Sequence, residues 1–78
     1  MIDIEKHAKH EKACSIIGKT LIFGDFFFPW HDGKSIKVSR SEDYSGGFTA
    51  DVFILDDLLY TNFFATAKYL YNYLILRV

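Results

Sequence analysis

A chain of 78 residues can fill one hydrophobic core but not two, so we expect residues 1–78 to form a single domain. Half of the residues are hydrophobic and 24% are charged, which excludes an intrinsically disordered chain. The net charge of −1 argues against both a strongly basic nucleic-acid binder and an acidic mimic of DNA. The single cysteine, Cys14, excludes an internal disulfide framework and is typical of a reducing compartment.

Neither end of the sequence predicts a targeting or membrane segment. The N-terminus, MIDIEKHAKHEK, lacks the apolar run of a secretory signal. The most apolar stretch, residues 58–78, is long enough to span a membrane, but Lys68 lies at its centre. A central lysine costs about 2.5–3.5 kcal/mol on insertion. We therefore expect a cytoplasmic protein without a membrane span.

The first predicted element is a helix over residues 4–17. Asp3 is a favoured N-cap residue, and Gly18 is the residue type preferred just after a helix. Apolar residues are sparse in this segment, so the helix should lie on the surface and bury only a narrow stripe that includes Cys14.

Three strands are predicted next. Residues 20–28 are rich in β-branched and aromatic side chains, and Pro29 should end that strand or lie at an edge of the sheet. The dipeptide Asp32-Gly33 is a strong hairpin signal. Apolar and polar residues alternate over residues 35–40, which indicates a half-buried strand, and residues 48–55 form the third strand.

A long helix is predicted to open at Asp56-Asp57 and to run to the C-terminus, because aspartate is favoured at helix N-termini. At 3.6 residues per turn its apolar residues gather into one wide arc, with Phe63, Leu70 and Leu74 among the most buried. The expected fold is therefore α+β, an α-β-β-β-α domain in which the C-terminal helix covers a three-stranded antiparallel meander.

The first helix carries the only cluster of metal-ligand residue types. Asp3, His7, His10 and Cys14 recur at spacings of four, three and four residues, which places them on one helix face. One straight helix supplies two ligands of a tetrahedral site, so the others would come from elsewhere, with His31 as the only other histidine. A histidine pair bordering a buried stripe explains the same pattern, and we expect no stoichiometric metal and no cofactor.

Catalytic constellations are not evident either. Cys14 and His10 are within reach on one helix, but near the predicted C-terminal end the helix dipole opposes formation of a thiolate. The carboxylate pairs Glu42-Asp43 and Asp56-Asp57 suit loop and cap roles. We therefore expect that the protein is not an enzyme.

A nucleic-acid surface would need cations and aromatic rings on one exposed face. Lys34, Lys37 and Arg40 lie in and around the second strand, and Phe26 and Phe28 could lie beside them. The simpler interpretation is a solvated strand with both phenylalanines in the core, so we expect nucleic acid not to be the partner.

Two features favour a protein partner. Trp30 follows Pro29 at a hairpin tip, where a small fold has little interior, and tryptophan is enriched at interface hot spots. On the outer side of the predicted C-terminal helix, the spacing predicts a stripe of tyrosines and small polar residues, namely Asn62, Thr66, Tyr69 and Tyr73.

These observations predict a small intracellular protein-binding module. It would act as a regulator or inhibitor of a partner protein, in the manner of phage or mobile-element accessory factors, and would self-associate, for instance as a homodimer. The first alternative is a metal- or histidine-dependent binding protein that uses the first helix. The second is a single-stranded nucleic-acid binder that uses the basic hairpin.

Overall fold

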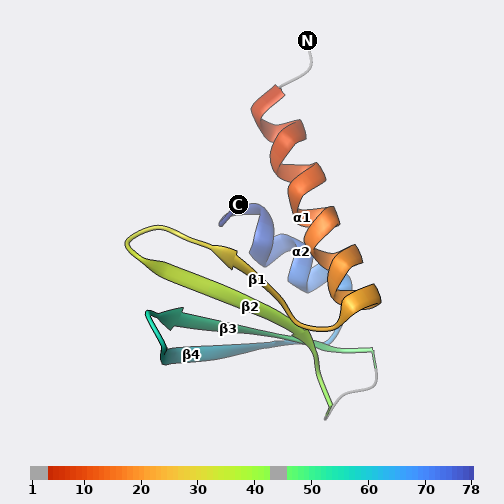
Figure 1. Cartoon of the computed structure of the whole chain (residues 1–78). Coiled ribbons are helices and arrows are strands. Elements are labelled where there is room, and N and C mark those ends of the chain that lie inside the picture. The colour runs from red at the N-terminus through yellow and green to blue at the C-terminus, as the bar shows by residue number, and fades with distance from the viewer. Residues whose placement is uncertain (1–3, 43–45) are drawn as a thin grey trace.

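The computed structural model describes residues 4–42 and 46–78 (Figure 1). Its elements follow the order α-β-β-β-β-α. The predicted α+β class is confirmed, but the sheet has four strands instead of three. The elements are α1 (Ile4–Phe23), β1 (Phe26–Pro29), β2 (Lys34–Arg40), β3 (Phe48–Ile54), β4 (Asp57–Phe64) and α2 (Ala67–Ile75).

The sheet is an antiparallel meander in the order β1-β2-β3-β4, so each strand pairs with its neighbour in sequence. The β1–β2 hairpin turns at Asp32 and Gly33, whose φ angles of 57° and 73° suit an Asp-Gly turn. Pro29 is the last residue of β1, at an edge of the sheet, as predicted. The meander topology is therefore confirmed.

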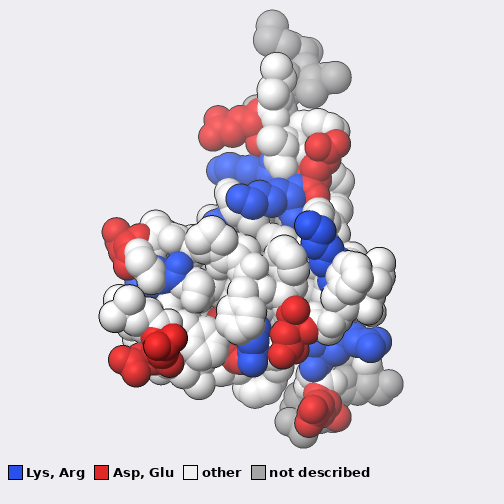
Figure 2. All heavy atoms as spheres, viewed as in Figure 1, with Lys and Arg blue, Asp and Glu red and all other residues white. Residues whose placement is uncertain are grey.

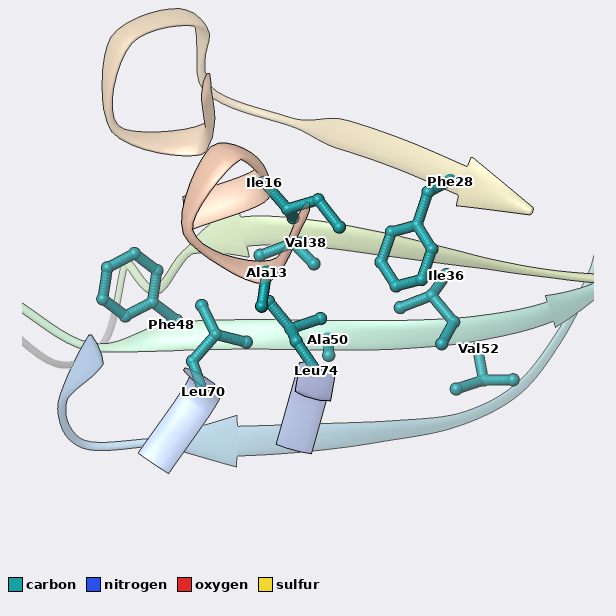
Figure 3. Close-up of a cluster of buried hydrophobic side chains, with 10 residues drawn as sticks. All are labelled: Ala13, Ile16, Phe28, Ile36, Val38, Phe48, Ala50, Val52, Leu70 and Leu74. Carbon is teal, nitrogen blue, oxygen red and sulfur yellow. The ribbon is translucent and has the colours of Figure 1, made fainter. Parts of the chain in front are cut away.

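Both helices lie against the same face of the sheet, so the molecule has two layers (Figure 1). Leu70 and Leu74 of α2 are fully buried, as predicted, and meet Ala13 and Ile16 of α1 over the sheet (Figure 3). Cys14 is exposed and lies outside the buried stripe of α1. The sheet contributes the rest of the core: Phe28, Ile36, Val38, Phe48, Ala50 and Val52.

The predicted long C-terminal helix is wrong over its first half. Leu55 and Asp56 form a tight turn, and Asp57 begins β4 instead of capping a helix. The helix begins after Thr66, whose side chain accepts a hydrogen bond from the backbone N–H of Tyr69 at 3.5 Å. Thr66 is therefore the N-cap of this helix, in place of the predicted Asp56-Asp57.

Helix α1 continues past Gly18, so the predicted strand from residue 20 is also wrong. A glycine inside a helix costs only about 1 kcal/mol, which the burial of Thr20 in the following turn can offset. Thr20 is fully buried, and its hydroxyl donates a hydrogen bond to the carbonyl of Ile16 at 2.8 Å. This bond satisfies a β-branched polar residue inside the helix, where propensity alone favours a strand.

Candidate functional site

The sheet has one face that neither helix covers, which we call the outer face. Side chains alternate between the two faces of a strand, so the residues before and after each buried core residue in a strand point outward. The aromatic residue Phe63, predicted to be buried, is 61% exposed on this face, and Phe27 and Leu58 are 58% and 55% exposed. Phe53 is half-buried, with its ring centroid 6.2 Å from that of Phe27. The outer face therefore exposes several large apolar side chains.

A polar row crosses the middle of the outer face, joining β2, β3 and β4. The ammonium of Lys37 lies 3.7 Å from Asp51 Oδ2, and the hydroxyl of Thr61 donates to Asp51 Oδ1 at 2.7 Å. Lys37 also lies over the ring of Phe27, 5.9 Å from its centroid. Because the carboxylate neutralises the ammonium, the centre of the outer face carries no net charge from this pair.

Trp30, the predicted anchor at the hairpin tip, is half-buried and packs against the edge of the core. The ring centroids of Trp30 and His31 lie 4.1 Å apart, and the ammonium of Lys34 lies 5.3 Å from the centroid of the Trp30 ring. The guanidinium of Arg77 approaches the same ring at 5.5 Å. Trp30 is thus held between cations and remains partly accessible.

The four residues predicted as one helical stripe are divided between a strand and a helix. Asn62 lies on β4 and points to the covered face, where its amide donates to the hydroxyl of Tyr73 at 3.3 Å. Tyr73 packs on Phe64 at 5.0 Å between ring centroids and is half-buried. Tyr69 and Tyr73 are the two members of this group that lie on α2, and of these only Tyr69 is strongly exposed. The predicted stripe is therefore not a continuous surface, because half of the segment is a strand.

Arg77 connects two residues that the sequence analysis treated as separate sites. Its guanidinium lies 3.6 Å from the ring centroid of Tyr73 and 5.5 Å from that of Trp30, and its Nη1 donates to the carbonyl of Tyr73 at 2.9 Å. Burial raises the pKa of the Tyr73 phenol above its ordinary value of 10.0, while the positive charge of Arg77 opposes that shift. The cluster holds the C-terminus against the β1–β2 hairpin.

The candidate metal ligands of α1 bind protein groups instead of converging. His7 pairs with Glu11 at 3.1 Å, and His10 bonds the hydroxyl of Tyr71 at 2.6 Å through Nδ1. Cys14 Sγ lies 3.7 Å from His10 Nε2. His31 pairs with its neighbour Asp32 at 2.8 Å, and Asp3 lies outside the described residues. In residues 4–42 and 46–78, no three His, Cys, Asp or Glu side chains form a group that could hold a metal ion.

The three cations of the predicted basic hairpin do not share a face. Lys37 points outward and pairs with Asp51, whereas Lys34 and Arg40 have the opposite orientation along β2. Phe28 is buried in the core, and the outward ring on β1 belongs to Phe27. Figure 2 shows acidic and basic side chains interspersed over one side of the molecule, without a continuous basic area.

The comparisons with known proteins give no relative. No known protein family, no curated protein and no solved structure matches this chain. Within the part of the chain that the structure describes, no helix is both long and apolar enough to cross a membrane.

Sequence reasoning missed the outer face because it assigned Leu58 and Phe63 to a helix. The segment from Leu58 to Phe64 contains aromatic and β-branched residues, which favour a strand, and Thr66 is a good helix N-cap. Together these signals could have moved the start of the helix to Thr66. The exposure of Phe27 follows from the alternation of β1 once Phe28 is known to be buried.

Proposed function

We propose that the protein is a protein-binding module that regulates or inhibits a partner by docking it on the outer face. The observation that supports this proposal is the set of exposed apolar side chains Phe27, Leu58 and Phe63 on the sheet face opposite to α1 and α2 (Figure 1). Large exposed apolar side chains gathered on one face are typical of interaction sites. Aromatic side chains add contact area at low entropic cost, because they have few rotatable bonds.

The charges of this face favour a protein over a nucleic acid. Single-stranded nucleic acids need cations beside the stacking rings to neutralise phosphates. The lysine at the centre of the outer face, Lys37, already has Asp51 as its partner. A face whose central charges are paired, with exposed apolar side chains beside them, instead suits a protein interface, which combines apolar contact with hydrogen bonds.

The test compares wild-type protein with the double variant Phe27→Ser and Phe63→Ser as bait in a native lysate. Both side chains are more than half exposed, so the variant should keep its fold, which circular dichroism checks. Leu21→Ser, an exposed position on α1, is the matched control.

We expect wild type and the control to recover one defined protein and the double variant to lose it, with affinity falling by at least about tenfold. Equal recovery by the double variant would show that the outer face is not the docking surface. Recovery that disappears after nuclease treatment would favour a single-stranded nucleic acid as the ligand.

A further inference from the structure

The two edge strands of the sheet differ in how they are protected. Strand β1 has four residues and ends in Pro29, which has no N–H to offer a further strand. Helix α1 contacts it, and the ammonium of Lys19 lies 5.2 Å from the ring centroid of Phe26. Short length, proline and a nearby lysine are the common devices that prevent edge pairing, so β1 is a closed edge.

Strand β4 lacks the short length and the proline of β1, and its one irregularity is a bulge beside Leu59. The strand is eight residues long, contains no proline and no lysine or arginine, and its only charged residue is Asp57 at the start. Apolar side chains are exposed on both of its faces, including Leu58, Leu59 and Tyr60, while a bulge beside Leu59 leaves the pairing of Tyr60–Phe64 regular. In the described chain no strand pairs with its outer side. A long apolar edge of this kind is a template for a further strand.

The charges near β4 favour a second copy of this chain as that strand. Two identical strands that pair antiparallel form a closed two-fold interface. This orientation places the two Asp57 carboxylates at opposite ends of the pair, about 34 Å apart at ~3.4 Å per residue when the register is centred on Asn62. A register centred on Asn62 brings Asp57 of one copy close to Lys68 of the other, in the first turn of α2. Both residues are exposed, and neither has an ion-pair partner among the described residues.

We infer that two copies of the chain associate through β4, antiparallel, into one continuous eight-stranded sheet. The added strand covers the exposed side chains Leu59 and Tyr60 and satisfies the free backbone groups of the edge. The outer faces of the two copies become one larger surface. The inference does not depend on the proposed docking function, because Phe27 lies at the opposite edge of the sheet.

Sedimentation velocity of the full chain over about 1 µM to 1 mM tests this inference. Wild type should convert from monomer to dimer as concentration rises. Leu59→Lys places a charge at the edge and should raise the dissociation constant by at least about tenfold. Leu21→Lys is the control, since Leu21 and Leu59 are 47% and 46% exposed. It should dimerise like wild type, as should Phe27→Ser.

A charge exchange tests the orientation of the two strands. Asp57→Lys and Lys68→Asp should each weaken the dimer, and the double variant should restore it, because the pair is then reversed but intact. A wild-type chain that stays monomeric throughout the range would overturn the inference. An unchanged dissociation constant for Leu59→Lys would also overturn it. A loss of dimerisation that is confined to Phe27→Ser would place the interface on the outer face.

Discussion

The two faces of the sheet differ sharply although the same strands build both. On β3, Val52 is buried under the helices, and its neighbour Phe53 lies on the outer face. In residues 4–42 and 46–78 the structure has two helices, and both lie on one side of the sheet (Figure 1). The outer face nevertheless keeps large apolar side chains, which a purely solvated face would not need. The covered face carries the hydrophobic core, and the outer face is the one on which we propose that a partner docks.

The largest effect should come from the covered face. Leu70→Ala removes a fully buried side chain between α2 and the sheet, and it should lower the free energy of unfolding by about 2–5 kcal/mol. Chemical denaturation measures this change. The control on the outer face is Phe63→Ala, which should cost less than about 1 kcal/mol because Phe63 is already mostly exposed. Equal losses at both positions would erase the distinction between the faces.

An intermediate effect is expected at the polar row of the outer face. Asp51→Ala removes the partner of both Lys37 and Thr61, and it should lower the free energy of unfolding by about 1–2 kcal/mol. Asp25→Ala, at an exposed loop position, should change it by less than about 0.5 kcal/mol. Thermal melts of the two variants compare them, and similar midpoints would mean that the row adds nothing to stability.

A smaller effect of opposite sign is expected at the turn that joins β3 to β4. Leu55 has a φ angle of 54° and is strongly exposed, so it holds a left-handed conformation without burial to offset the strain. Leu55→Gly should raise the free energy of unfolding by about 0.5–1 kcal/mol. Leu58→Gly, in the following strand, should lower it instead. A destabilised Leu55→Gly variant would show that this leucine makes contacts worth more than the strain.

The smallest effect concerns pH. The pKa of Tyr73 is raised in the folded protein, chiefly by burial, so the neutral phenol is favoured there. Its contribution to stability is complete below the ordinary pKa of 10.0 and is lost as pH rises through the folded pKa. Denaturation at increasing alkaline pH should therefore show stability falling above about pH 10. Tyr73→Phe should reduce this fall, and Tyr69→Phe, at an exposed position, should not.

The sequence was sufficient for the parts of the fold where one periodicity dominates. The alternation around Ile36 and Val38 fixed β2, and Asp32-Gly33 fixed its hairpin. The C-terminal third was ambiguous, because its apolar residues fit both a helical arc and a strand. The deciding turn contains Leu55 at a positive φ angle, a residue type that does not signal such a turn.

The candidate site was harder to predict than the fold. An outer face exists only when four strands pair in register, and Phe27, Phe53 and Phe63 come from three of them. No local pattern states which sheet face the helices will cover. Trp30 and Tyr73 were predicted from residue type, but their connection through Arg77 depends on where the C-terminus lies.

Helix α1 has a dynamic consequence at its N-terminal half. Its first fully buried residue is Ala13, and no residue from Ile4 to Lys12 is buried. A helical segment without a buried residue is marginal in water, so these turns depend on propagation from the packed half. A hydrogen bond between His10 and the hydroxyl of Tyr71 joins this half of α1 to α2. Amide hydrogen exchange should accordingly slow along α1 from its first turn toward Ala13. The N-terminal turns would then unfold and refold locally while the core stays folded.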